Sequence, residues 1–109
     1  MAIELQKKES FNGNIAIDGS ESVELATAKS DYLQILVDDG SGGTPGTYDL
    51  ELDYYVPDFD DWMTFSLQTS QTARGVNVDV RAAKTRVTIT NQTGEESSYR
   101  FIAQGFKVI

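Results

Sequence analysis

Apolar and polar residues alternate along most of the chain, and the alternation is clearest in residues 47–69. In residues 48–55 the even-numbered positions carry apolar side chains. The odd-numbered positions carry three carboxylates and, at the end of the run, Tyr55. A period of two sends successive side chains to opposite faces of a strand. Pro57 lacks a backbone N–H, so this strand should end before the acidic turn at 56–61. A second strand is predicted after the turn, with Met63, Phe65 and Leu67 inward and Trp62, Thr64 and Ser66 outward.

The rest of the chain repeats this pattern in short runs separated by Gly, Asn, Asp and Ser. The Asn12-Gly13-Asn14 segment indicates a bulge or a tight turn. Residues 21–29 also suit a helix by propensity, but Val23 and Leu25 fall two apart, which favours a strand. Gly105 predicts a bulge, after which the chain would change face or sheet. The strands expected in addition to the central hairpin are residues 2–8, 11–17, 22–26, 31–38, 76–81, 84–90 and 97–108, and the longest loop is 39–46.

Eight or nine short strands without a convincing helix predict an all-β chain. Its 109 residues suffice for one hydrophobic core, and no linker or repeat divides them. We therefore expect a single antiparallel β-sandwich domain spanning residues 1–109, either a jelly roll or an immunoglobulin-like fold.

Charge narrows the range of partners. Seventeen acidic and nine basic residues give a net charge of −8, which argues against binding to a nucleic acid backbone. Residues 1–61 hold 14 acids and 3 lysines, whereas residues 62–109 hold 3 acids and 6 bases, including all four arginines. This asymmetry predicts either scattered pairs on a solvated surface or head-to-tail contact between copies. An acidic surface with only five lysines also suits a protein that works in high salt.

The residue types that are missing limit the chemistry. The chain has no His and no Cys, so it has no Ser-His-Asp or Cys-His triad and no thiolate or imidazole zinc site. Paired carboxylates of the glycosidase kind remain, but they need a cleft that a domain of this size rarely has. The N-terminus carries no apolar run of the signal-peptide kind, and no stretch is long enough to span a membrane. We expect a protein that is not an enzyme, needs no cofactor, has no membrane partner and is made in the cytoplasm.

Two acidic loops could hold calcium, which takes six to eight oxygen ligands. The candidate ligands for this metal are Asp38, Asp39, Asp58, Asp60 and Asp61. Neither loop has the spacing of an EF-hand, and Asp, Gly and Ser also serve simply to form turns. The prediction is therefore no metal site, with calcium as an alternative.

Aromatic side chains on the outward side of the central hairpin are a third possibility. Tyr55 and Trp62 face outward by the alternation, and Phe59 lies in the turn between them. A flat aromatic surface beside carboxylates can hold a sugar ring. An apolar patch on a small domain more often contacts protein, so a covered hairpin is favoured over a sugar site.

The ending of the chain, TRVTITNQTGEESSYRFIAQGFKVI in residues 85–109, resembles the last two strands of small β-sandwich accessory proteins on the virions of tailed viruses, of the capsid decoration and turret type. The acidic bias is similar to that of haloarchaeal tailed viruses. The resemblance implies a non-enzymatic structural protein of the virion that assembles as a symmetric homo-oligomer on a capsid shell. Under it, Tyr55, Phe59 and Trp62 would be anchors between subunits, and Arg74, Arg81, Arg86 and Arg100 would meet acidic faces of neighbours or of a capsid protein. The alternative function is a carbohydrate-binding module, with or without calcium, in which Tyr55 and Trp62 stack on sugar.

Overall fold

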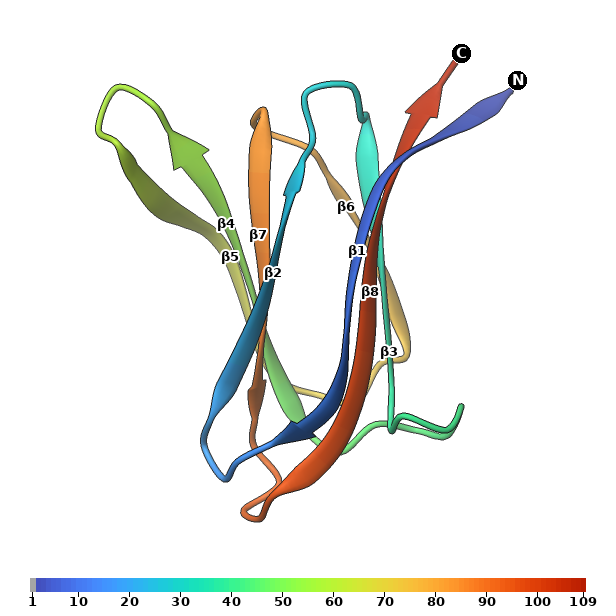
Figure 1. Cartoon of the computed structure of the whole chain (residues 1–109), viewed down its shortest axis with the longest axis vertical. Helices are drawn as coiled ribbons and strands as arrows, with labels where there is room; N and C mark the ends of the chain where they lie inside the picture. Colours follow the sequence, from blue (N-terminus) through green and yellow to red (C-terminus); the bar gives the residue numbers. More distant parts are fainter. Residues whose placement is uncertain (1) are drawn as a thin grey trace.

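The computed structural model describes residues 2–109, which form two four-stranded antiparallel sheets packed face to face (Figure 1). These two sheets confirm the predicted all-β sandwich. The described residues contain no helix that could cross a membrane. Its eight strands are β1 (Ile3–Ile15), β2 (Ser20–Ala26), β3 (Tyr32–Asp38), β4 (Tyr48–Val56), β5 (Asp61–Gln71), β6 (Gly75–Asp79), β7 (Lys84–Asn91) and β8 (Ser97–Val108).

The strand order identifies the topology as a jelly roll. One sheet has the order β1-β8-β3-β6 and the other β2-β7-β4-β5. Consecutive strands lie in opposite sheets throughout, except for β4 and β5, which form a hairpin within one sheet. Eight strands divided between two sheets in this way form the paired Greek keys of a jelly roll, so the immunoglobulin-like alternative is not adopted.

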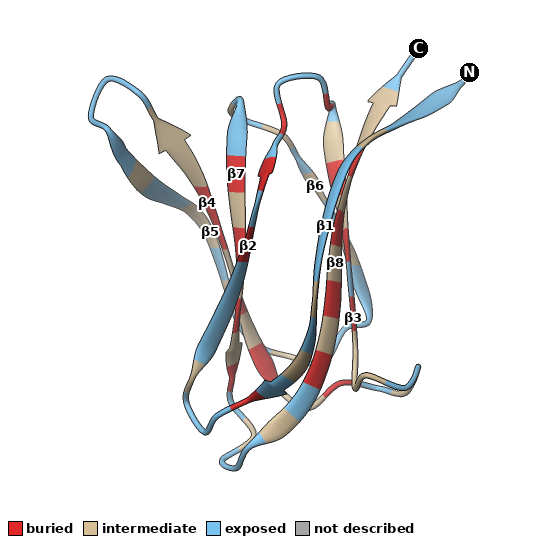
Figure 2. Ribbon diagram, in the orientation of Figure 1, coloured by how far each residue is buried: buried red, intermediate tan, exposed pale blue. Residues whose placement is uncertain are grey.

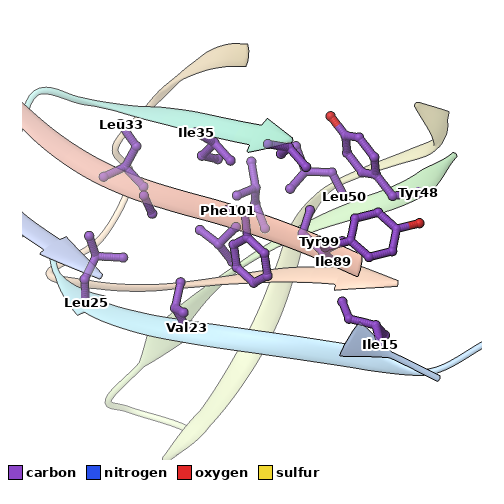
Figure 3. Packing of buried hydrophobic residues seen from close by; sticks show 14 residues of the cluster. Ile15, Val23, Leu25, Leu33, Ile35, Tyr48, Leu50, Ile89, Tyr99 and Phe101 are labelled. Carbon is purple, nitrogen blue, oxygen red and sulfur yellow. The ribbon is translucent and has the colours of Figure 1, made fainter. Parts of the chain in front are cut away.

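The core lies between the sheets, where the inward residues of both meet (Figures 2 and 3). Buried and less buried positions alternate along β7 and β8, as the period of two requires. The Tyr99 hydroxyl remains hydrogen-bonded in this setting, because it donates to the Thr47 carbonyl oxygen at 2.8 Å. The fully buried aliphatic and aromatic side chains are Ile15, Leu33, Ile35, Val37, Tyr48, Leu50, Leu52, Val87, Ile89, Tyr99, Phe101 and Ala103.

The first two predicted strands are in fact one. Residues 2–8 and 11–17 were expected to be separate, but β1 runs unbroken from Ile3 to Ile15 alongside β8. Asn12-Gly13-Asn14 pairs in continuous register with residues 98–100, so it forms neither a turn nor a bulge. The irregularity lies instead between Leu5 and Lys8. A long partner strand can hold a sequence that would form a turn by itself.

The inward face expected for the second strand of the hairpin is wrong after its third residue. Trp62 and Thr64 pair with Tyr55 and Asp53, but the next pair is Ser66 with Leu52, which leaves Phe65 as an extra residue in β5. One extra residue reverses the alternation beyond it. Leu67 consequently points outward and is 57% exposed, rather than lying in the core.

Gly105 does not bend β8. Residues 100–106 pair with β3 in unbroken register, and Phe106 lies on the outer face, stacked on Tyr32 with ring centroids 5.1 Å apart. The glycine is needed for space, because a Cβ at this position would lie 2.2 Å from Ser30 Oγ. The predicted bulge and change of sheet at Gly105 are therefore wrong.

Candidate functional site

The β4–β5 hairpin places two aromatic rings side by side on the outer face of its sheet. Tyr55 pairs directly with Trp62, so both side chains leave the same face, as the alternation predicted. Their ring centroids are 5.6 Å apart, in an edge-to-face arrangement. The Tyr55 hydroxyl donates to Asp60, which adopts a left-handed backbone conformation with φ 50° in the turn after Pro57.

Two cations from β7 lie over these rings. The Arg86 guanidinium carbon is 4.6 Å from the centroid of the Trp62 ring, and Lys84 Nζ is 5.5 Å from the Tyr55 ring and 5.7 Å from the Trp62 ring. Because β4 separates β5 from β7, the indole must reach across the sheet to make these contacts. Both cations are therefore placed where the negative potential of an aromatic face favours a positive charge. We call the surface formed by Tyr55, Trp62, Lys84, Arg86 and Asp53 the aromatic face.

A buried carboxylate holds the arginine of the aromatic face in place. Arg86 Nε and Nη2 donate to Asp53 Oδ2 at 3.1 and 2.8 Å, and the Asp53 side chain is only 2% exposed. Burial acts to raise the pKa of Asp53, but the hydrogen bonds from Arg86, Thr64 and Glu51 and the charge of Arg86 together outweigh it and hold that pKa below its usual value. The other oxygen, Oδ1, is buried without a hydrogen-bond partner among the described residues.

Glu51 lies two residues before Asp53 on the same side of β4. A hydrogen bond to the Asp53 carboxylate, together with partial burial and repulsion from that charge, raises the pKa of Glu51 above its ordinary value, although Arg86 opposes the change. The protonated form of Glu51 can therefore supply the donor that Asp53 Oδ1 lacks.

The same outer face continues as a band of polar side chains. Ser20 pairs with Thr90 and Ser22 with Thr88 across β2 and β7, with hydroxyl oxygens 2.6 and 2.7 Å apart. Glu24 Oε1 lies 4.0 Å from Lys84 Nζ, so this ion pair connects the polar band to the aromatic face. The sheet thus offers rings at one end and hydroxyl and carboxylate groups along its length.

The seven residues predicted at an interface do not form one surface. Tyr55, Trp62 and Arg86 lie together on the aromatic face, with Phe59 70% exposed in the adjoining turn. Arg74 and Arg100 line a hollow of about 310 Å³ on the other sheet, where Arg100 is paired with Asp38. Arg81 lines a separate hollow between β5 and β6.

Sequence reasoning missed Lys84, Glu51 and Asp53 as members of the site. Alternation did place both carboxylates on the outward face of the hairpin. The missing information was the pairing of β7 with β4, which brings Arg86 opposite Asp53 although they are 33 residues apart.

The proposed calcium ligands are engaged in other interactions or lie apart. Asp38 accepts hydrogen bonds from Arg100, which hold the pKa of its carboxyl below the usual value. Asp39 accepts the backbone N–H groups of Ser41 and Gly43. Asp58, Asp60 and Asp61 follow one another in the hairpin turn, and residues 2–109 contain no group of three or more carboxylates arranged to hold a metal ion.

Comparison with known proteins places the fold but not a family. The sequence matches no family model and no curated protein. Among solved structures, the Yersinia pseudotuberculosis-derived mitogen has a TM-score of 0.67 at 13% identity, covering 91% of this chain and 86% of the mitogen. PliG from Aeromonas hydrophila, a periplasmic inhibitor of g-type lysozyme, has a TM-score of 0.59 at 8% identity, with coverage of 92% and 86%. CBM28, a carbohydrate-binding module specific for non-crystalline cellulose, has a TM-score of 0.56 at 12% identity, with coverage of 98% and 82%. At these identities the likeness concerns the fold alone.

Proposed function

We propose that this protein is a non-catalytic binding domain that holds a saccharide on its aromatic face. The observation that carries the proposal is the half-buried pair of Tyr55 and Trp62 on the outer face of the sheet, with Arg86 fixed against the indole. The C–H groups of a pyranose ring pack well on a flat aromatic ring whose other face is already supported. The hydroxyl band on β2 and β7 and the carboxylate of Glu51 would then hydrogen-bond to sugar hydroxyls.

Two further observations support a binding role. The chain contains neither His nor Cys, so a cysteine nucleophile and a histidine general base are missing. A cellulose-specific binding module shares the sandwich fold, which makes the fold suitable for such a task without assigning it.

The single tryptophan allows a direct test, because Trp62 is the only indole in the chain. We expect its fluorescence to change on titration with soluble oligosaccharides, with the affinity confirmed by calorimetry. Trp62→Ala should weaken binding about tenfold or more, while Phe59→Ala, which removes an exposed aromatic ring from the neighbouring turn, should leave it unchanged. Equal affinity of wild type and Trp62→Ala, or no binding across a broad glycan panel, would contradict the proposal.

Self-association on a virion is the second candidate, and one surface favours it. β1 and β8 pair up to their ends, so the two termini lie together (Figure 1). Ile3, Leu5, Phe106 and Val108 line this corner on one face, and Leu5 is 66% exposed. An apolar patch of this kind suits contact between copies. No comparison links the chain to a virus, a capsid or a halophile, so its place in a virion stays a prediction.

Light scattering tests this second candidate. A symmetric oligomer predicts a particle mass that is a whole multiple of 12.0 kDa, and Leu5→Glu should lower it. Leu67→Glu is the matched control, since Leu67 is also exposed but lies on the other sheet. A fall in mass with Trp62→Ala instead would locate the contact at the aromatic anchors predicted from the sequence. A mass of one chain in low and in high salt would contradict self-association.

A further inference from the structure

The two rings of the aromatic face already bind cations, and these cations belong to the protein itself. Lys84 Nζ lies between 5 and 6 Å from the centroids of both Tyr55 and Trp62. The negative potential of an aromatic face attracts an ammonium group, most strongly at Trp. The position above the two rings is therefore one in which a positive charge is stable.

The two cations over the rings are held with different firmness. Arg86 is fixed by two hydrogen bonds to a carboxylate that is almost fully buried. Lys84 has a half-exposed side chain, and its only ion pair among the described residues is with Glu24 at 4.0 Å, at the limit of a salt bridge. A ligand can displace Lys84 at little cost, whereas displacing Arg86 would leave Asp53 buried and unpaired.

Carboxylates outnumber cations around this position. Lys84 and Arg86 are the cations of the aromatic face, and the carboxylates on it or at its rim are Glu24, Glu51, Asp53, Asp60 and Asp61. The whole chain carries −8, so the surrounding field also favours a positively charged ligand and repels an acidic one.

We infer that the saccharide is a basic one, an amino sugar whose ammonium group takes the place of Lys84 Nζ above Tyr55 and Trp62. Glu24, released from Lys84, then accepts a hydrogen bond from the ligand ammonium. A neutral sugar stacks without this contact and binds more weakly, and a uronic acid is excluded by the carboxylates. This inference rests on the proposed function, because it names the ligand class of the same site.

Matched oligosaccharides test the inference. Glucosamine oligomers and N-acetylglucosamine oligomers of equal length differ in the positive charge, and galacturonate oligomers supply the negative one. At low ionic strength, and at a pH at which the amine is protonated, we expect glucosamine oligomers to bind about fivefold tighter or more than the acetylated ones, and galacturonate not to bind. Salt at about 1 M should remove most of this preference.

The Lys84→Ala variant gives the test its second readout. Removing the competing cation should tighten glucosamine binding severalfold and leave N-acetylglucosamine binding within about twofold. Lys107→Ala is the matched control, because it removes the same charge from β8 in the other sheet and should leave the preference unchanged. Equal or tighter binding of the acetylated oligomers, or weaker glucosamine binding by Lys84→Ala, would overturn the inference alone. If none of the three oligosaccharides binds the folded protein, the inference and the proposed function fail together.

Discussion

Asp53 and Glu51 show how two similar carboxyls on one strand differ through their surroundings. Both were predicted to face outward from β4, yet Asp53 is buried and hydrogen-bonded to Arg86 while Glu51 is only partly buried. Arg86 favours the ionised form of Asp53, and ionised Asp53 favours the protonated form of Glu51. The pair therefore titrates together, and the ionised Glu51 is the member that costs stability.

Glu51→Gln should stabilise the protein near pH 7 by at most about 1 kcal/mol, because the amide removes the repulsion and supplies a donor for Asp53 Oδ1. The pKa of Glu51 is raised on folding, so the folded state holds the proton more tightly and stability falls as the pH rises through that pKa. The advantage of the variant should therefore vanish below a pH of about 4.3, where Glu51 is protonated in both states. Urea unfolding at the two pH values measures this.

Glu9→Gln is the control, since it removes an exposed glutamate from β1. It should change stability little at either pH. A Glu51→Gln variant that is less stable than wild type near neutral pH would show that the ionised carboxylate makes a contact that stabilises the fold.

The alternation of apolar and polar residues located nearly all the strands, but it did not predict which strands pair. The strands at 31–38, 48–55 and 84–90 agree with β3, β4 and β7 within one residue. The errors occur where a partner strand decides the outcome: β1 stays extended through Asn12-Gly13-Asn14, β5 gains a bulge at Phe65, and β8 passes Gly105 without one. For the same reason, the outward rings were predictable, whereas the contact of Arg86 with Asp53 was not.

Asn91, at the end of β7, forms hydrogen bonds to several separate segments of the chain. No pattern in the sequence predicts this role. Its side-chain amide donates to the carbonyl oxygens of Ile15 and Glu95 at 2.9 and 2.7 Å, and its Oδ1 accepts from the Thr93 backbone N–H. The residue is fully buried. One side chain thus ties the end of β1 to the turn between β7 and β8.

Asn91→Asp should destabilise the fold by about 3 kcal/mol near pH 7, because it buries a charge and removes both amide donors. The measurement is the free energy of unfolding in urea. Asn14→Asp makes the same change at an exposed position of β1 and should cost much less. Similar losses for the two variants would mean that the Asn91 network contributes little.

The jelly-roll topology brings the acidic residues 1–61 and the more basic residues 62–109 next to each other. Strands from the acidic part of the chain alternate with strands from the basic part in both sheets, because the orders are β1-β8-β3-β6 and β2-β7-β4-β5. Each ion pair among the described residues joins an acid before residue 62 to a base after it: Glu24 with Lys84, Asp53 with Arg86, and Asp38 with Arg100. The asymmetry along the sequence therefore serves pairing within one copy. The expected contact of arginines with neighbouring copies stays a prediction, in which Arg74 and Arg81 are the two without an ion pair in residues 2–109.

The excess of acids that remains after this pairing predicts how salt changes stability. The net charge of −8 repels itself across a small fold, whereas the Glu24–Lys84 ion pair is exposed on both sides and contributes little. Screening should therefore stabilise the protein, and the midpoint of thermal unfolding should rise by about 4 °C or more between low salt and about 1 M sodium chloride. A Glu95→Lys, Glu96→Lys variant, with net charge −4, should respond less, because both glutamates are exposed and its self-repulsion is smaller. A midpoint that falls as salt is added would mean that the ion pairs outweigh the repulsion, and it would count against a protein adapted to high salt.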